Sequence, residues 1–199
     1  MFYPRFVKPF FDLWVAIVLL VLLSPLLLLI AGINYCLYGE VFFRQIRTGK
    51  NMCGFYFVKF KTMHEQTDSE GTLLPDVHRI TGFGRFLRHS SLDELPQLWM
   101  VLKGDMSLIG PRPLLPEYNI LYNKEQKRRF SVKPGISGWA QVHGRNKQTW
   151  AERFALDIYY IEHISFFLDM KTGLLTILQV VKSGDVNASE NETMPPFNQ

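Results

Sequence analysis

The sequence predicts an α+β protein in which an N-terminal membrane helix precedes a small, mostly helical domain. Residues 13–33 read LWVAIVLLVLLSPLLLLIAGI, an uncharged and almost wholly apolar run. About 20 apolar residues are enough to cross a bilayer as a helix. The segments Val41–Gln45 and Phe55–Phe60 have strand-like composition, and several later segments carry apolar residues at helical spacing. We therefore expect a short β-element combined with interfacial amphipathic helices.

The apolar run lies within a helix expected over 9–35, and a proline near its middle is expected to break this helix. Pro25 removes a backbone hydrogen bond and clashes with the preceding turn, which favours a break at Ser24-Pro25. Basic residues mark the cytoplasmic side of a membrane segment. Here they flank both ends of the run: Arg5, Lys8, Arg44, Arg47 and Lys50. The residues alone leave two topologies open, a single-span anchor and a re-entrant hairpin bent at Pro25.

The length of the run argues against a cleaved signal peptide, whose apolar core usually has about 7–15 residues and ends at a small-residue site. This run is longer and offers no convincing site. We therefore assign residues 1–38 to the membrane element. The following segment, 39–183, has the length of one domain. Residues 184–199 are polar and are expected to form a disordered tail.

Glycine and proline mark the expected loops of the domain, and apolar residues at spacings of three and four mark its expected helices. In chain order we expect a loop over 64–77, helices over 80–89 and 93–102, an irregular segment over 103–116, a helix over 117–130, a loop over 131–148, and helices over 150–161 and 164–182. The last helix has an apolar face. This face suits the membrane interface or the domain core, and both remain open.

Composition limits the class of function. The chain has 199 residues, 47% of them hydrophobic, and a net charge of +4, which fits an anionic leaflet or a phosphate-bearing ligand. Many cytosol-facing membrane proteins are equally basic. The two cysteines, Cys36 and Cys53, lack a metal-type spacing and suggest reduced thiols. The phosphate-binding loop G-x-x-x-x-G-K-[ST], the dinucleotide fingerprint and H-E-x-x-H are absent from the sequence.

The adjacent carboxylates Asp93 and Glu94 are the best candidates for chemistry. A structural role is the alternative, because Ser91 with Glu94 fits the capping-box pattern. A cap at Ser91 would place Pro96 beyond the first turn, so a helix start nearer Asp93 is favoured. The helix dipole would then keep Asp93 charged. Such an exposed carboxylate of low pKa suits a nucleophile toward phosphorus or a Mg²⁺ ligand.

Basic residues gather in the loops around this pair. Arg112 lies between two prolines, a restricted backbone that suits presentation of a guanidinium group to phosphate. A single cation is usually a solubilising surface charge. Several cations in loops rich in glycine and proline favour a polyphosphate ligand. The candidates are Lys59, Lys61, Arg79, Arg85, Arg88, Arg112, Lys133 and Arg145.

Four segments of the chain carry a resemblance to a known family. They are Phe43-Arg44-Gln45, Lys59-Phe60-Lys61-Thr62-Met63, SLDELPQLWMVLKGDMSLIGPRPL and KPGISGWAQVHGR. With them the chain resembles the bacterial sugar transferase family, the monotopic phosphoglycosyl transferases. The similarity runs from about residue 5 to about residue 183. The chain is similar to the small members of that family, which consist of the catalytic unit alone.

The resemblance implies an enzyme that moves a sugar-1-phosphate from a UDP-sugar to polyprenyl (undecaprenyl) phosphate and releases UMP. This is the first membrane step of glycoconjugate biosynthesis, on the cytosolic face of the bacterial inner membrane. Asp93 would attack the β-phosphate and form a covalent phosphosugar-aspartyl intermediate, and Glu94 would hold Mg²⁺. The family's helix-break-helix element matches Ser24-Pro25 and implies a re-entrant hairpin. Family cations that contact phosphate or nucleotide map to Lys59, Arg88, Arg112 and Arg145.

The resemblance leaves some points open. His143 stands where asparagine is common in the family and Lys133 where arginine is common, so the sugar is not determined. Two other classes are a non-catalytic membrane adaptor that binds anionic lipid, and a glycosyltransferase that passes the sugar alone and releases UDP. The expected partners are the UDP-sugar, polyprenyl phosphate and inner-membrane lipid, with a homodimer as an option. No nucleic acid is expected, because Trp139 and Trp150 suit packing.

Overall fold

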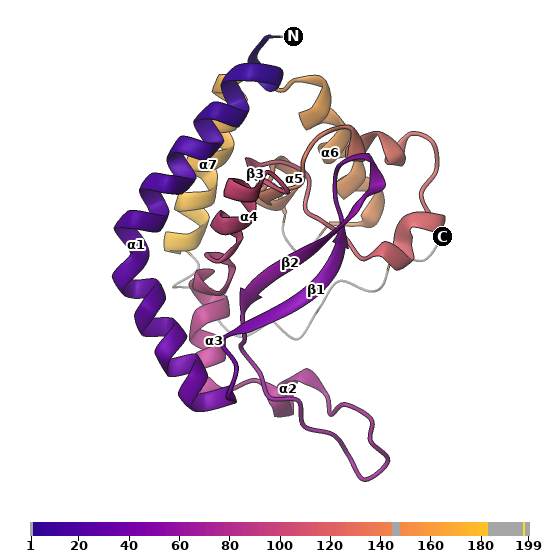
Figure 1. The fold of residues 1–199 in the computed structure, drawn as a ribbon. Coiled ribbons are helices and arrows are strands. Elements are labelled where there is room, and N and C mark those ends of the chain that lie inside the picture. Colours follow the sequence, from indigo (N-terminus) through magenta and orange to yellow (C-terminus); the bar gives the residue numbers. More distant parts are fainter. Residues whose placement is uncertain (1, 145–147, 183–196, 198–199) are drawn as a thin grey trace.

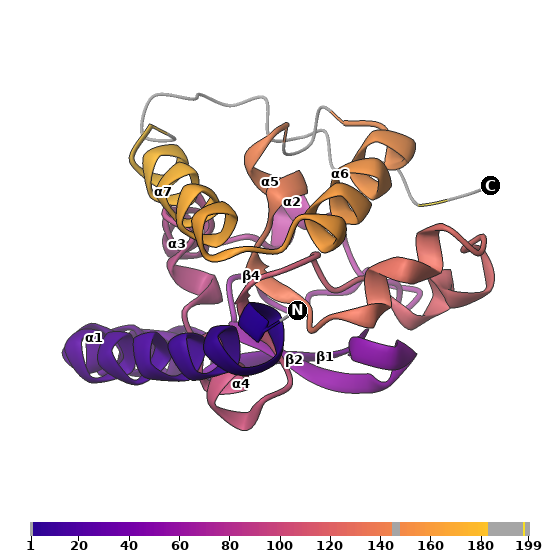
Figure 2. The ribbon, with the colours of Figure 1, turned by 90° about the horizontal axis from the view of Figure 1, so that it is seen from above.

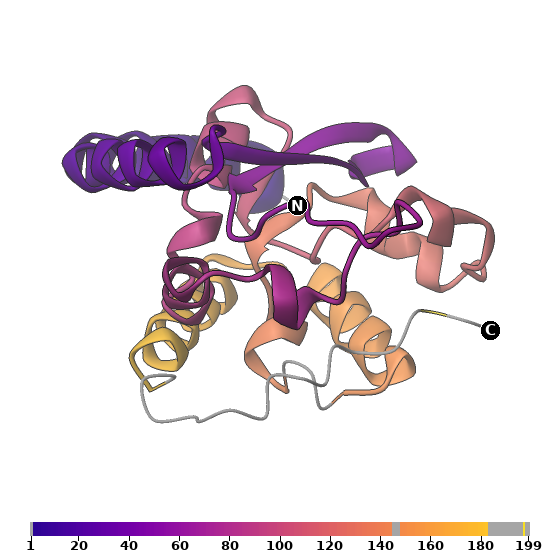
Figure 3. The ribbon, with the colours of Figure 1, turned by 90° about the horizontal axis from the view of Figure 1, so that it is seen from below.

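The computed structural model describes residues 2–144, 148–182 and 197, and it shows an α+β protein. A long apolar helix, α1 (Lys8–Tyr38), runs along one side of a domain of short helices and two small sheets (Figure 1). Helix α4 (Gln97–Lys103) packs against it, and α7 (Phe166–Lys182) is joined to its N-terminal end by the Lys8–Asp169 ion pair. Figures 2 and 3 show α1 and α7 on the same side of the molecule. The predicted α+β class, with a long N-terminal apolar helix before a mostly helical domain, is confirmed.

The remaining elements are short. The α-helices are α2 (Asp76–Arg79), α3 (Gly82–His89), α5 (Trp139–Val142) and α6 (Trp150–Glu162). A π-helical turn, η1 (Tyr3–Val7), precedes α1, and the 3₁₀ turns are η2 (Lys50–Met52), η3 (Leu92–Glu94), η4 (Pro116–Ile120) and η5 (Gln126–Ser131). The strands are β1 (Phe42–Thr48), β2 (Gly54–Phe60), β3 (Ser107–Ile109) and β4 (Gly135–Ser137).

The two predicted strands form an antiparallel hairpin, which confirms that prediction. Strands β1 and β2 pair from Phe42 opposite Phe60 to Thr48 opposite Gly54. Phe57 and Phe60 of β2 are buried, and Phe57 packs in one cluster with Ala16 of α1 and Leu98 of α4. The hairpin therefore links the membrane helix to the helix that follows the carboxylate pair.

The hydrogen-bonded turns of helix α1 continue through Pro25, so the predicted break into two separate helices at Ser24-Pro25 is wrong. The helix instead bends near its middle, and its two halves run in different directions (Figure 1). Proline has no N–H, so the carbonyl of Val21, one turn earlier, loses its usual partner. The Ser24 hydroxyl donates to this carbonyl at 2.8 Å instead. This hydrogen bond satisfies the orphaned carbonyl, so the helix remains continuous.

Buried polar side chains attach both ends of α1 to the domain. Near the N-terminal end, the Lys8 ammonium group lies 2.8 Å from a carboxylate oxygen of Asp169 at the start of α7. Near the C-terminal end, the Asn34 amide donates to the carbonyl oxygens of Val41, at 3.0 Å, and Lys61, at 2.9 Å. The rest of α1 turns many large apolar side chains outward. Among the described residues, Tyr3–Tyr38 is the helical stretch long and apolar enough to cross a membrane.

Two predictions for the middle of the chain are wrong. Residues 117–130 do not form one helix, because a turn separates η4 from η5. In this turn the Asn123 and Gln126 side chains each accept the other residue's backbone N–H at 2.9 Å. Residues 131–148 are not wholly a loop, since β4 and α5 lie within them. Strand β4 pairs in parallel with β3, which lies in the segment expected to be irregular.

Other helix predictions are confirmed. Helix α3 matches the predicted helix over 80–89, α6 matches 150–161, and α7 matches 164–182. Thr81 caps α3 by accepting the N–H of Gly84 at 2.9 Å. Of the tail expected over 184–199, the structure describes Phe197, which packs against Tyr122. The remainder of that tail lies outside the described residues.

Replacing Lys8 with methionine should destabilise the fold by about 3–5 kcal/mol, because two buried carboxylates would lose their cation. Asp12 and Asp169 lie 3.6 Å and 2.8 Å from the Lys8 ammonium nitrogen. Thermal or denaturant unfolding in detergent micelles measures the change. The control Lys124→Met removes an exposed lysine and should leave stability unchanged. An unchanged midpoint for Lys8→Met would show that this ion pair does not hold α1.

Candidate active site

The two adjacent carboxylates lie in the single turn η3, between α3 and α4. Ser91, just before this turn, has the left-handed backbone conformation, with φ 56° and ψ 17°, which is rare for a residue with a side chain. Its side chain makes no capping hydrogen bond, and α4 begins later, with Pro96 as N-cap. The predicted capping role is therefore wrong. A strained residue here costs roughly 1–3 kcal/mol and is typical of functional sites.

Asp93 is buried rather than exposed. It is 5% exposed, and its carboxylate lies 3.8 Å from the Lys59 ammonium group of β2. Burial and, to a smaller extent, the neighbouring charge of Glu94 raise the pKa of Asp93 to about 6, while the charge of Lys59 opposes the shift. The prediction of an exposed carboxylate with a low pKa is therefore wrong. Burial likewise lowers the pKa of Lys59.

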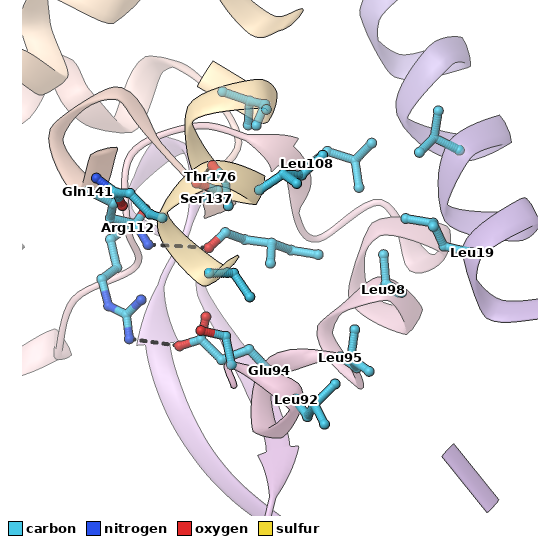
Figure 4. A pocket seen from close by; sticks show the side chains of 18 of the residues that line it. Leu19, Leu92, Glu94, Leu95, Leu98, Leu108, Arg112, Ser137, Gln141 and Thr176 are labelled. Atoms are coloured by element: carbon cyan, nitrogen blue, oxygen red, sulfur yellow. Dashed lines mark hydrogen bonds and ion pairs between the residues drawn. The ribbon is translucent and has the colours of Figure 1, made fainter. Parts of the chain in front are cut away.

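Glu94 pairs with Arg112, the arginine between two prolines. The Arg112 guanidinium donates to a Glu94 carboxylate oxygen at 2.9 Å, and this pair raises the pKa of Arg112 (Figure 4). A hydrogen bond from Arg129 fixes the Arg112 backbone. Arg129 donates to its carbonyl oxygen at 2.8 Å and forms a buried ion pair with Asp157 at 2.8 Å. Sequence reasoning missed this support, because the pair joins η5 to α6 across the fold.

Arg88 reaches the site from α3. Its guanidinium donates to the Thr62 hydroxyl at 3.0 Å, and Thr62 follows β2. Gly84 makes this approach of α3 to β2 possible, because a Cβ at Gly84 would overlap the Thr62 carbonyl oxygen. Glycine at position 84 therefore allows α3 to pack closely against the end of β2, and this packing brings Arg88 to the same cavity as Asp93.

These residues line one cavity of about 1010 Å³. Glu94, Arg112 and Gln141 lie at one side of it, and Leu19, Leu95 and Leu98 lie at the other (Figure 4). The cavity is thus amphipathic: charged groups gather around Asp93, and aliphatic side chains predominate between α1 and α7, where Asp12 and Asp169 also line it. Such a cavity suits a ligand that combines phosphate with hydrocarbon.

Five of the six residues that the family resemblance assigned to the site meet in this cavity, whereas the further cation candidates Lys61, Arg79, Arg85 and Lys133 do not line it. Lys59, Arg88, Asp93, Glu94 and Arg112 all line it. Arg145 lies outside the described residues. Gln141 and Arg153 also line the cavity and were not predicted. Gln141 lies within the segment KPGISGWAQVHGR, which was the available signal, whereas Arg153 of α6 has no distinguishing local pattern.

The carboxylate pair fits a magnesium ion better than a soft metal. Among the described residues, no group of three or more His, Cys, Asp or Glu side chains is placed to hold a metal ion by itself. Mg²⁺ is usually bound by one or two carboxylates together with substrate phosphates and water. Glu94 would supply such a carboxylate, and the surrounding cations suit the phosphates.

Comparison with known proteins decides the family. The family model described as bacterial sugar transferase matches residues 3–183. This chain belongs to the bacterial sugar transferase family. The resemblance inferred from the sequence motifs is thereby confirmed.

The relatives of this sugar transferase differ in length. It is 47% identical over 191 residues to the uncharacterized sugar transferase EpsL of Bacillus subtilis, covering 96% of this chain and 95% of EpsL. It is 42% identical over 183 residues to the UDP-glucose:undecaprenyl-phosphate glucose-1-phosphate transferase of Xanthomonas campestris, covering 85% of this chain but 38% of that protein. The exopolysaccharide production protein ExoY of Rhizobium meliloti is 36% identical over 194 residues, covering 88% and 86%.

Asp93→Asn should stabilise the folded sugar transferase at neutral pH. The folded protein holds the Asp93 proton more tightly than the unfolded chain does, since the pKa is raised from 3.8 to about 6. Stability is therefore greatest at low pH and falls as the pH rises from about 4 to about 6. The variant escapes this loss, so its advantage should grow by roughly 1–2 kcal/mol between about pH 4.5 and pH 7.5.

Unfolding in micelles with a chelator present measures this difference. Asp105→Asn, which changes an exposed carboxylate just after α4, should give no pH-dependent advantage. If Asp93→Asn is less stable than the unsubstituted protein at neutral pH, ionisation of Asp93 does not destabilise the folded protein as predicted.

Proposed function

We propose that this sugar transferase moves a sugar-1-phosphate from a UDP-sugar to undecaprenyl phosphate and releases UMP. Relatives from Xanthomonas campestris, Caulobacter vibrioides and Klebsiella pneumoniae carry the name UDP-glucose:undecaprenyl-phosphate glucose-1-phosphate transferase. The observation that carries the proposal is the burial of Asp93 beside Glu94 and cations, in a cavity that aliphatic side chains of α1, α4 and α7 also line. Phosphate chemistry and a hydrocarbon tail are both accommodated there.

The reaction follows from one nucleophile used twice. The Asp93 carboxylate attacks the β-phosphorus of the UDP-sugar, and the bond from this phosphorus to the bridging oxygen breaks. UMP leaves with that oxygen, and the sugar phosphate stays on Asp93 as an acyl phosphate. A phosphate oxygen of the lipid then attacks the same phosphorus, which regenerates the carboxylate and forms a lipid diphosphate sugar. The two displacements at one site predict ping-pong kinetics.

The cations of the chain hold and orient the phosphates during both steps. Lys59 lies beside Asp93, and Arg112 is fixed by Glu94 and by the Arg129 support, so each faces the reacting phosphorus with little freedom. Arg88 adds a third cation, and Arg145 is expected to add another. Glu94 would hold Mg²⁺, which offsets negative charge on the phosphates when bound.

Membrane placement follows from the two attachments of α1. Lys8 and Asn34 are separated by most of the helix, yet both bind the same domain. The domain has polar and charged side chains around both attachments, so a bilayer cannot separate them at acceptable cost. We infer a re-entrant helix that enters and leaves one leaflet. The basic flanks favour the cytosolic face of the inner membrane.

Two rival functions explain less of the site. A membrane adaptor that binds anionic lipid has no use for a buried carboxylate beside a strained serine, because both features cost stability. A transferase that passes the sugar alone requires attack on a sugar carbon and releases UDP. The identity of the released nucleotide separates the three functions in one assay.

Asp93→Asn should abolish UMP release with undecaprenyl phosphate, lowering turnover by roughly 10³-fold or more, because the amide cannot attack phosphorus. The protein should still associate with membranes. Incubation of the unsubstituted enzyme with UDP-glucose, UDP-galactose or another UDP-sugar and Mg²⁺, without lipid, should add the mass of one sugar phosphate at Asp93. The variant should show no such adduct in intact-protein mass spectrometry.

The control is Asp105→Asn, which should keep both turnover and adduct formation. UDP as the product would support the sugar-only transferase, and no nucleotide release from any UDP-sugar would support the adaptor. Near-normal UMP release by Asp93→Asn would rule out Asp93 as the nucleophile.

A cysteine at position 2 should report the same side of the membrane as a cysteine in the domain. Phe2 is 73% exposed, and Glu70 lies in an exposed turn of the domain. Phe2→Cys and Glu70→Cys, each made after Cys36 and Cys53 are replaced by serine, should resist an impermeant thiol reagent in intact cells. Both should react in inverted vesicles. Labelling of Phe2→Cys alone in intact cells would establish a spanning helix.

A further inference from the structure

The cavity that contains Asp93 extends well beyond the carboxylate and its cations. Its volume of about 1010 Å³ is at the upper end of ordinary small-molecule sites, which span about 300–1,000 Å³. Its far part lies between α1 and α7. These helices are joined at their N-terminal ends by Lys8 with Asp169, at 2.8 Å, and by the edge-to-face rings of Phe11 and Phe166. Beyond this junction the cavity separates them.

Aliphatic side chains on two helices line much of this far part, and Asp12, Asp169 and Thr176 line it as well. Val15, Leu19 and Leu23 follow one another at intervals of four residues on α1, so they form one stripe that faces the cavity. Gly173 and Ile177, also four residues apart, line it from α7. Figure 4 shows Leu19 directed from α1 toward Leu98 and the cavity. We call this part the α1–α7 groove.

The outer faces of the same two helices are apolar and exposed. Val21, Leu22 and Leu28 on α1 are each about 70% exposed, and Phe167 and Val181 on α7 are 83% and 73% exposed. Side chains of this kind face hydrocarbon rather than water. The groove therefore lies between two lipid-facing surfaces, and its inner end meets the cations around Asp93.

We propose that the α1–α7 groove binds the first isoprenoid units of the acceptor lipid, with its phosphate at the cations near Asp93. The inference rests on the proposed function, and it specifies in addition where the hydrocarbon tail of the acceptor lipid binds. A free phosphate or nucleotide has no hydrocarbon to place against the α1 stripe. An ordinary phospholipid carries two hydrocarbon chains, whereas the acceptor lipid carries one chain attached directly to the phosphate that must reach Asp93.

Gly173 provides a sharp test, because it keeps part of the groove open. A Cβ at Gly173 would meet no atom within 4 Å, so alanine adds a methyl group to open space, and a larger side chain extends from there into the cavity that Gly173 lines. Replacing glycine within a helix also favours the helix, by up to about 1 kcal/mol. Gly32 of α1 is a matched control, since it too has no atom within 4 Å of its Cβ position and lies outside the cavity lining.

The experiment measures the two half-reactions separately for Gly173→Ala, Gly173→Leu, Gly173→Trp and Gly32→Trp. The first is UMP release and adduct formation from UDP-glucose without lipid. The second is transfer from the isolated adduct to undecaprenyl phosphate in micelles. For Gly173→Trp we expect an unchanged first half-reaction and a second slowed roughly tenfold or more, the cost of excluding about two methylene groups from apolar contact.

The loss should increase from alanine to leucine to tryptophan, and Gly32→Trp should behave as the unsubstituted enzyme. Unfolding temperatures of all variants verify that the fold is retained. Unchanged lipid transfer by a folded Gly173→Trp overturns the proposal, and so does loss of the first half-reaction, which would assign the groove to the UDP-sugar. If the unsubstituted enzyme forms no adduct, the proposed function itself fails, which is a different result.

Discussion

The attachment of α1 at both ends is the constraint on which the rest of the structure depends. Lys8 binds Asp169 at the start of α7, and Asn34 binds two backbone carbonyls next to the hairpin. Between these points α1 forms one wall of the cavity, so its position sets the distance between hydrocarbon and the carboxylate pair. The Ser24 hydroxyl keeps the helix continuous through Pro25, which allows a single helix to reach both attachments.

The electrostatics of the site follow from burial next to that wall. Asp93 loses water and has Glu94 beside it, and both effects favour its protonated form. Lys59 and Arg112 oppose them, and Arg112 is itself held by Glu94 and Arg129. Asp93 is therefore poorly solvated and lies near cations, of which Arg112 is fixed by its hydrogen bonds. Phosphates and a metal ion would complete the charge balance of this site, as expected for phosphoryl transfer.

The errors of sequence reasoning share a cause. The local pattern places Asp93 beside a helix cap, yet α3 ends at His89 and α4 begins only at Gln97, so Asp93 lies in a buried 3₁₀ turn between them. The helix expected over 117–130 is interrupted because Asn123 and Gln126 bind each other's backbone. Local pattern cannot weigh these competing hydrogen bonds against helix propensity. Strands β3 and β4 are three residues each and pair across the chain, so no local periodicity marks them.

The sequence by itself determined the apolar helix, the hairpin strands, the α+β class, the family and the residues placed as site candidates. These depend on composition, spacing and motifs, which are local properties of the chain. Only the tertiary structure decided that Asp93 is buried, that Arg129 and Asp157 support Arg112, and that α1 and α7 enclose an apolar groove. Desolvation and contact between distant segments arise from packing, and no short stretch of sequence encodes them.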